Sequence, residues 1–245
     1  MTAVGVIPAR YAASRFPGKP LVSIAGLPMV RRVWEGASSA TTLRAVIVAT
    51  DDARIAQACR GFGAPVVMTR PDHSTGTDRL AEVAMSLQDE TIVNIQGDEP
   101  LIEGFVVDAA VAALEESGEA PMATVIQPAE EDGLDDPNRV KVVLDRRGDA
   151  LYFSRSRIPA QRAGAPAPRY WQHVGLYAYR RDFLLEFVSL EPAPLERSEQ
   201  LEQLRALEHG YRIRCATVRE WRSVPVDVPE DVARVEARLR ERSPR

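Results

Sequence analysis

The residues best suited to chemistry lie in the opening stretch, residues 3–21. A short apolar run ends at Pro8, and the polar loop that follows carries Arg10, Arg15 and Lys19. Strong anions bind where backbone N–H groups and fixed positive charges lie close together, and arginine adds forked, bidentate donors. The spacing matches neither a GxxxxGK[ST] loop nor a GxGxxG fingerprint. We therefore predict a polyphosphate-binding loop of another kind.

Lysine is scarce in this chain, and this scarcity supports a functional role for Lys19. Among the 31 basic residues only Lys19 and Lys141 are lysines, and the others are arginines. Against such a bias, a retained lysine indicates a need for a compact point charge in place of a planar fork. This argument favours a functional role for Lys19 and is weaker for Lys141, which lies inside a strand pattern.

A candidate metal ligand follows the apolar run 91–95. Asp98, in the segment QGDEP (96–100), comes directly after this run. Mg²⁺ is usually held by one or two carboxylates together with phosphate oxygens, and a rigid strand end positions a carboxylate well. The alternative, a cap for a helix beginning at residue 104, is too distant to be convincing. The role of Glu99 stays open.

The elements that must position these groups follow an alternating pattern typical of parallel strands joined by helices. We predict strands at 4–7, 45–49, 65–68, 91–95 and 122–126, with helices at 28–38, 53–61, 77–87 and 104–116. Pro28 suits a first helical position, Asp51 or Asp52 can cap the second helix, and Thr75 or Thr77 can cap the third. Because such sheets bind ligands at the carboxyl ends of their strands, the polar clusters at 10–19, 49–52, 70–79 and 96–100 should converge on one crevice.

The second half of the chain has a different organisation. An acidic loop precedes a predicted hairpin at 139–145 and 150–155, followed by a Pro-, Ala- and Gly-rich surface loop at 159–169. We then expect a strand at 173–180, helices at 181–189 and 195–208, a strand at 213–218 and a helix from near Pro229 that buries Val232, Val235 and Leu239. We interpret about 137–205 as an insertion that covers the site and supplies a dimer surface.

Bulk properties restrict the class of protein. At 245 residues and 45% hydrophobic content the chain can bury a sizeable core, and its formal charge of −4 argues against a nucleic-acid binder. No apolar run is long enough for a membrane span, and the first twenty residues do not read as a signal peptide. We therefore expect a cytoplasmic protein with no nucleic-acid or membrane partner. Cys59 and Cys215 are predicted to be buried free thiols.

The opening motif also carries a resemblance. The stretch PARYAASRFPGKPL (8–21) resembles the signature of sugar-acid cytidylyltransferases, and most of all that of the 3-deoxy-manno-octulosonate (KDO) cytidylyltransferase family. The likeness extends over nearly the whole chain. It implies one Rossmann-like α/β nucleotidyltransferase domain over 1–245, with a mostly parallel central sheet flanked by helices and the inserted hairpin and helix region for acceptor binding and dimerisation. CTP, Mg²⁺ and a homodimer are likewise expected from it.

The resemblance implies the nucleotide contacts. RPDHSTGTDR (70–79) is similar to the family's cytosine-recognition segment, although Thr75 replaces the usual serine. From the residues alone, Gly76 permits close approach to a flat base, and the threonines could equally cap a helix. The nucleotide-binding set is Pro8, Ala9, Arg10, Lys19, Thr75, Gly76, Thr77, Arg79 and Asp98.

The acceptor and the second metal ligand also come from the resemblance. In similar proteins, segments like YFSRSRIP, HVGLY and PLERSEQLEQLR bind the sugar acid, with Arg157 meeting its carboxylate. Without that likeness these residues would be read as surface or helix-face positions, and Glu199 and Gln203 as one turn apart on a helix. Asp227 aligns with an acid that donates the second Mg²⁺ carboxylate, where the residues alone favour a helix cap. The acceptor set is Gln96, Arg157, His173, Tyr177, Glu202 and Gln203.

The expected reaction is transfer of CMP from CTP to the anomeric hydroxyl of KDO, giving CMP-KDO and pyrophosphate. Arg10, Arg15 and Lys19 would hold the triphosphate, Asp98 and Asp227 would hold Mg²⁺, and no general base is assigned. Two alternatives stay open. The arginine-rich, alanine-rich composition and the departures at Gln172, Pro225 and Val228 leave room for another acceptor, such as a small phosphonate, and a nucleotide sensor would bind CTP without turnover.

Overall fold

The computed structural model describes residues 2–12 and 16–242, and the chain divides into two compact units. Unit 1 comprises the residues up to Asp108 together with those from Ser223 onward, and unit 2 comprises Ala109–Arg222. The boundary falls within helix α4 (Gly104–Glu116). Both units combine strands and helices, which confirms the predicted α/β class. The single domain with an insertion at 137–205 stays a prediction.

Unit 1 is built on a parallel sheet in the order β6-β1-β4-β5. Its strands are β1 (Ala3–Ala9), β4 (Leu43–Thr50), β5 (Val66–Met68) and β6 (Thr91–Asn94). In register, Val6 lies opposite both Ile47 and Asn94. Nearly every residue of β1 is buried, as expected for a parallel strand covered on both faces. The four strands predicted for this part of the chain are confirmed.

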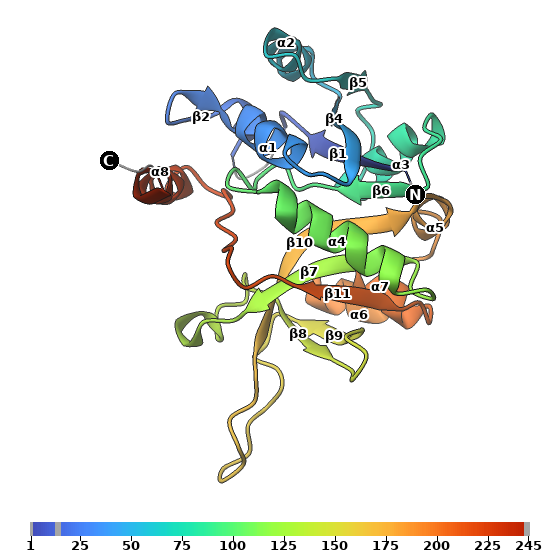
Figure 1. The fold of residues 1–245 in the computed structure, drawn as a ribbon, viewed down its shortest axis with the longest axis vertical. Helices are drawn as coiled ribbons and strands as arrows, with labels where there is room; N and C mark the ends of the chain where they lie inside the picture. Colours follow the sequence, from blue (N-terminus) through green and yellow to red (C-terminus); the bar gives the residue numbers. More distant parts are fainter. Residues whose placement is uncertain (1, 13–15, 243–245) are drawn as a thin grey trace. The chain divides into compact units, whose positions relative to one another are not determined.

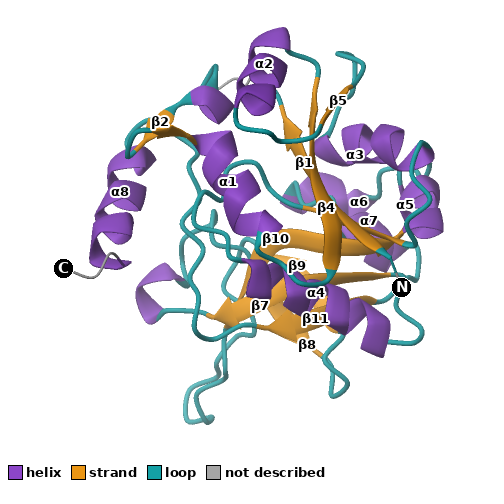
Figure 2. Ribbon diagram, turned by 45° about the horizontal axis from the view of Figure 1, so that its top comes forward, coloured by secondary structure: helices purple, strands orange, loops and turns teal. Residues whose placement is uncertain are grey.

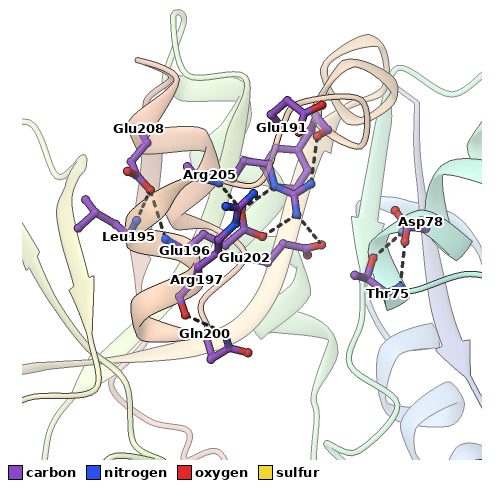
Figure 3. A network of polar contacts seen from close by, with 12 residues as sticks. Thr75, Asp78, Glu191, Leu195, Glu196, Arg197, Gln200, Glu202, Arg205 and Glu208 are labelled. Carbon is purple, nitrogen blue, oxygen red and sulfur yellow. Dashed lines mark hydrogen bonds and ion pairs between the residues drawn. The ribbon is translucent and has the colours of Figure 1, made fainter.

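The helices of unit 1 begin where the sequence supplies caps. They are α1 (Met29–Ser38), α2 (Ala53–Gly61) and α3 (Gly76–Met85). Asp52 accepts the Arg54 N–H at the start of α2, and Thr75 and Asp78 form a reciprocal capping box on α3 (Figure 3). Pro28 is the N-cap of α1, one position before the first helical residue.

A small hairpin near the start of unit 1 lies beside the last helix of the chain, and the sequence analysis did not predict it. It consists of β2 (Ser23–Ile24) and β3 (Leu27–Pro28), and it follows a short 3-10 turn, η1 (Lys19–Leu21). Helix α8 (Asp231–Arg242) lies beside β2 in Figures 1 and 2, where the Ala25 N–H donates to Glu236 at 2.8 Å. The core here contains Ile24, Met29, Leu101, Val226 and Val235, with Val232 and Leu239 packed against it. The predicted buried face of the last helix is therefore confirmed.

Unit 2 has mixed pairing. β7 (Met122–Pro128) pairs antiparallel with β10 (Trp171–Arg180) and parallel with β11 (Ile213–Thr217). The predicted hairpin is present as β8 (Lys141–Leu144) and β9 (Ala150–Ser154), with β8 also pairing with β10. A short 3-10 turn, η2 (Glu131–Gly133), follows β7. Figure 1 shows the segment between β9 and β10 as a loop that extends away from the strands of this unit, as predicted.

The helix predicted at 195–208 is wrong as a continuous element. After α5 (Arg181–Phe187), the chain forms α6 (Pro194–Glu199) and then α7 (Leu204–Glu208). Gln200 adopts a left-handed φ of 52°, and the Arg155 side chain donates to the carbonyl oxygens of Glu199 and Gln200 at 2.6 and 3.1 Å. Those carbonyls are the ones that a continuing helix would pair internally. Glu199 and Gln203 are therefore not one turn apart on a helix.

The described part of the chain has no helix that combines the length and the apolar character needed to cross a bilayer.

Candidate functional site

One ammonium group joins the two aspartates that the sequence analysis singled out. Lys19 Nζ lies 3.0 Å from an Asp98 carboxylate oxygen and 3.7 Å from an Asp227 oxygen, and it donates to the Val226 carbonyl at 2.9 Å. Asp98 and Asp227 lie 129 residues apart in the sequence. They meet around a single cation, and Lys19 is only 16% exposed at its side chain.

Local backbone geometry brings Lys19 to this position. Gly18 has a φ of 75° and its N–H donates to the Tyr11 carbonyl at 2.8 Å, which closes the base of the opening loop. Pro20 then sits in the first turn of η1, so Lys19 starts a rigid turn. On the other side, the Val226 N–H donates to the Asp98 carbonyl at 2.9 Å. This backbone bond places the residue after Val226 next to Asp98.

The turn that carries Asp227 has its own capping group. Asp231 accepts the N–H groups of Asp227 and Val228 at 2.7 and 3.1 Å and pairs with Arg234 at 2.7 Å. These bonds are the cap interactions that an aspartate before a helix normally supplies. Because Asp231 makes them, the carboxylate of Asp227 is directed to Lys19 instead.

Glu99 lies buried behind the aspartate pair. Its side chain accepts a hydrogen bond from the Ser223 hydroxyl, and its other carboxyl oxygen has no hydrogen-bond partner among the described residues. Burial raises the pKa of Glu99 to about 8, opposed by the Ser223 hydrogen bond and reinforced by the nearby Asp98 and Asp227. At neutral pH this carboxyl is therefore mostly protonated, which avoids a third negative charge beside the pair.

A second cationic group in unit 1 surrounds Arg10. Its Nη1 donates to the Ser74 carbonyl at 3.3 Å, while its Nη2 is buried with no hydrogen-bond partner among the described residues. Burial, followed by the nearby Arg79 charge, lowers the pKa of Arg10. Two arginines held close together form a site that favours an anion. The predicted Arg15 lies outside the described residues.

Arg79 occupies the interior behind this group. It is 0% exposed, donates to the Thr69 hydroxyl, and lies 3.2 Å from an Asp51 oxygen. These contacts link the polar clusters at 10–19, 49–52 and 70–79. The contact of Lys19 with Asp98 links the first of these clusters to the one at 96–100. The four clusters are therefore in contact, as expected, and the crevice that they should line stays a prediction.

Close backbone packing accompanies the convergence. A Cβ at Gly97 would lie 3.0 Å from the Pro8 carbonyl oxygen, and one at Gly76 would lie 3.4 Å from the Pro8 ring. Glycine at both positions lets the loops approach the end of β1, which also carries the buried Ala9. Thr77 is buried at the start of α3, and Gln96 is half-buried just after β6.

Arg157, in unit 2, is surrounded by acceptors. It donates to the Tyr170 hydroxyl at 3.1 Å and to Glu131 at 2.9 Å, and its Nη1 lies 3.8 Å from Asp135. The hydrogen bond to Tyr170, followed by the one to Glu131, raises the pKa of Arg157. Its guanidinium already binds carboxylates from the acidic loop, which is the chemistry that a sugar acid would offer.

His173 and Tyr177 lie on β10 in an aromatic setting. The His173 ring packs edge-on against Phe153 at 5.0 Å and beside Tyr177 at 5.4 Å between ring centroids. Its Nε2 lies 3.0 Å from the Thr124 hydroxyl. Burial lowers the pKa of His173 to about 3, so the imidazole is neutral at physiological pH. Burial, followed by Glu202, raises the pKa of Tyr177 well above its usual value.

Glu202 and Gln203 lie in the break between α6 and α7. Figure 3 shows Arg205 between two carboxylates: it binds Glu196 through both ends of its fork at 2.9 and 2.6 Å, and Glu202 at 3.9 Å. Gln203 is 5% exposed, and its amide nitrogen has no hydrogen-bond partner among the described residues. A buried donor left unpaired points to a ligand that supplies the acceptor.

Sequence reasoning missed several groups that hold the site together. Arg205 and Glu196 lie nine residues apart in PLERSEQLEQLR, and a helix break between them was needed to recognise the pair. Asp231 could have been identified, because it is an aspartate at the first position of the last helix. The contact of Glu99 with Ser223 had no local signal.

No group of three or more His, Cys, Asp or Glu side chains placed to hold a metal occurs within residues 2–12 and 16–242. Asp98 and Asp227 form a pair, which is the number of carboxylates that Mg²⁺ commonly takes when a phosphate supplies further oxygens. Their convergence on one cation shows that this pair already accommodates positive charge.

Comparisons with known proteins agree with this chemistry. A family model described as cytidylyltransferase matches residues 4–213. The 3-deoxy-manno-octulosonate cytidylyltransferase of Syntrophotalea carbinolica is 54% identical, over 98% of this chain and 99% of that protein. The mitochondrial enzyme of that name from Arabidopsis thaliana is 48% identical, over 98% of this chain and 84% of its own length. A solved structure of CMP:2-keto-3-deoxy-manno-octonic acid synthetase complexed with CTP is 43% identical, covers 99% of this chain and 100% of that chain, and has a TM-score of 0.94.

Proposed function

Because the chain belongs to the 3-deoxy-manno-octulosonate cytidylyltransferase family, we propose that it transfers CMP from CTP to the anomeric hydroxyl of KDO. The products are CMP-KDO and pyrophosphate, and the sugar nucleotide serves lipopolysaccharide biosynthesis. The observation that carries the proposal is the meeting of Lys19 with Asp98 and Asp227 at 3.0 and 3.7 Å. Nucleotidyl transfer depends chiefly on positioning and on neutralising phosphate charge, and this group supplies both signs of charge at one point.

The triphosphate is held by the cations of unit 1. Arg10 has a buried donor with no hydrogen-bond partner among the described residues, which favours an incoming phosphate oxygen. Lys19 is fixed by Gly18 and the η1 turn, so its charge stabilises the departing pyrophosphate without reorganisation. Pro8, Ala9, Thr75, Gly76 and Thr77 complete the nucleotide set. Arg15, predicted to be a catalytic cation of the triphosphate, lies outside the described residues and stays a prediction. Arg79, buried against Asp51, adds a second positive charge near Arg10.

Asp98 and Asp227 fit a divalent cation. They are hard oxygen ligands that already converge on one positive charge, and the protonated Glu99 behind them removes a competing repulsion. When bound, Mg²⁺ would neutralise phosphate charge and lower the pKa of the acceptor hydroxyl. Lys19 then supplies a third positive contact to the phosphates beside the carboxylate pair. No general base is assigned.

The sugar acid is bound by the polar groups of unit 2. Arg157 takes its carboxylate through forked donors, in exchange for Glu131 and Asp135 of the acidic loop. Gln203 supplies a buried amide donor that has no hydrogen-bond partner among the described residues. His173, Tyr177 and Glu202 bind hydroxyls, with Glu202 oriented by Arg205. Gln96, in unit 1, is kept in the acceptor set.

A pyrophosphate-release assay tests the proposal. The purified full chain is incubated with CTP and Mg²⁺ and with KDO, another sugar acid or a small phosphonate. We expect pyrophosphate release only when KDO is the acceptor, and no release when Mg²⁺ is left out. Release with the phosphonate and not with KDO would replace the acceptor and leave the CMP transfer standing. CTP binding without release from any acceptor would favour a nucleotide sensor.

The homodimer expected from the sequence belongs to this proposal, and light scattering of the purified chain measures it directly. A mass near twice the 27.0 kDa of one chain is expected. The cytoplasmic location stays a prediction.

A further inference from the structure

The hydroxyl of Thr124 has three possible hydrogen-bond partners and only one proton to donate. Thr124 is fully buried on β7, and its Oγ1 lies 2.8 Å from the Leu176 carbonyl oxygen, 3.1 Å from the Val174 carbonyl oxygen and 3.0 Å from His173 Nε2. A threonine hydroxyl donates one proton and accepts through two lone pairs. The position of that one proton therefore determines whether His173 Nε2 donates a hydrogen bond to this hydroxyl or accepts one from it.

The two carbonyl oxygens come from an irregular part of β10. The pairing of β10 with β7 shifts register between Val174 and Tyr177, a bulge that interrupts the ladder. Carbonyl oxygens only accept, so an Oγ1 at 2.8 Å from the Leu176 oxygen requires a proton between the two atoms. If the hydroxyl donated its proton to His173 instead, the lone pairs of Oγ1 would face those of both carbonyl oxygens. The hydroxyl proton is therefore committed to the backbone.

The tautomer of His173 follows from this commitment. With its proton used, Oγ1 can only accept from Nε2, so Nε2 must carry a hydrogen. The ring packs against Phe153 and Tyr177, and a flip would place a carbon in place of Nε2 beside Oγ1 and lose this hydrogen bond. Burial lowers the pKa of His173 to about 3, which agrees with a neutral ring. A neutral imidazole with a hydrogen on Nε2 has a bare lone pair on Nδ1.

We propose that Thr124 is a positioning residue that fixes His173 as the Nε2–H tautomer, so that Nδ1 accepts a hydrogen bond from a hydroxyl of the acceptor. The substrate part of this inference rests on the proposed function. In this arrangement Arg157 donates hydrogen bonds to the carboxylate of the acceptor. Nδ1 of His173 can only accept, so it binds a hydroxyl, which can donate. An acceptor with an anionic oxygen at that position would meet a lone pair and would be rejected.

Nitrogen NMR of the whole protein tests the tautomer directly. The chain has three histidines, so a sample labelled with ¹⁵N-histidine gives few signals, and His173→Gln identifies its own by their loss. We expect one protonated Nε2 and one bare Nδ1 for His173, unchanged from about pH 5 to pH 8. Thr124→Ser keeps the hydroxyl and should keep this pattern. Thr124→Val removes it and should populate the other tautomer. An Nδ1–H tautomer in the unsubstituted protein would overturn the proposal.

Kinetics test the substrate part. Thr124→Val should raise KM for KDO about tenfold and leave KM for CTP within about twofold, whereas Thr124→Ser should restore the KDO value. Thr217→Val, at an exposed strand threonine of the same unit, is the matched control and should change neither constant. An unchanged KM for KDO in a folded Thr124→Val would refute the role in recognition. If that variant does not fold, the spectrum of the unsubstituted protein and the serine variant still decide the tautomer.

The two proposals fail separately. A protein that shows the Nε2–H tautomer but releases no pyrophosphate with KDO would refute the proposed function and the recognition role, and the hydrogen-bond arrangement would stand. A protein that turns over KDO with an Nδ1–H histidine would keep its function and refute the inference.

Discussion

Replacing His173 by glutamine should reduce the loss of stability that the fold suffers between pH 7 and pH 5. Glutamine can place an amide N–H near the position of Nε2 and so keep a donor toward Thr124, but it does not titrate. In the folded protein burial lowers the pKa of His173 to about 3, from an ordinary value of 6.5. Below pH 6.5 the unfolded chain therefore takes up a proton that the folded chain refuses. The contribution of His173 to stability is complete above pH 6.5 and is lost as the pH falls toward 3.

The magnitude follows from these two pKa values. Between them, the free energy of unfolding falls by up to about 1.4 kcal/mol for each pH unit. From pH 7 to pH 5 the unsubstituted protein should lose about 2 kcal/mol more than His173→Gln. This figure hardly changes for any folded-state pKa below about 4, because at pH 5 the native histidine is then already neutral.

Urea unfolding at pH 5, 6 and 7, followed by tryptophan fluorescence, measures the difference. His209→Gln, at an exposed histidine whose Nε2 lies 3.1 Å from the Glu191 carbonyl, is the matched control and should follow the unsubstituted protein. Because other groups titrate equally in both proteins, only the gap between the two curves matters. If the unsubstituted protein and His173→Gln run parallel from pH 7 to pH 5, His173 is protonated in the native state and the reasoning about its neutral ring is wrong.

Three further substitutions test the packing and the metal ligands. Gly36→Ala would place a Cβ 2.1 Å from the Ile102 carbonyl oxygen, so we expect about 1–3 kcal/mol lower stability in urea despite alanine's better helix propensity, while Gly61→Ala, with open space around it, should not destabilise. Glu199→Ala removes the acceptor for Ser154 and for the backbone N–H that follows it, and should cost about 1–3 kcal/mol. Asp227→Asn should raise the Mg²⁺ concentration for half-maximal pyrophosphate release about tenfold or more, with little change in urea stability, and an unchanged Mg²⁺ requirement would remove this residue from the metal site.

The parts of the site that follow strand ends could be predicted from the sequence. The order of apolar runs indicates which loops share an edge of a parallel sheet, so the loops that carry Lys19 and Asp98 were expected to lie close together. Helix caps are local, and they were predicted at Asp51 or Asp52 and at Thr75 or Thr77; the structure uses Asp52 and Thr75. What these predictions share is that neighbouring residues, or a simple sheet rule, determine the outcome.

The parts that could not be predicted depend on contacts between distant segments. The break at Gln200 looks like helix in sequence, and it is stabilised by Arg155, which comes from the end of β9. Arg79 was expected in the nucleotide-binding set, facing the base or its neighbours, and only the fold reveals that it is fully buried beside Asp51. The tautomer of His173 depends on a bulge in β10, which no periodicity in the sequence indicates. In each case a tertiary contact overrides the local pattern.

The two departures from the family pattern near Asp227 can now be judged by the bonds that the backbone makes. Proline at 225 removes an N–H, but the bond that holds this segment to Asp98 is donated by Val226, so that bond does not depend on residue 225. Val228 has no side-chain hydroxyl, but its backbone N–H donates to Asp231 at 3.1 Å, and Asp231 also fixes Asp227. Both substitutions therefore spare the contacts that bring Asp227 to Lys19, and they give no reason to expect a different metal site or a different acceptor.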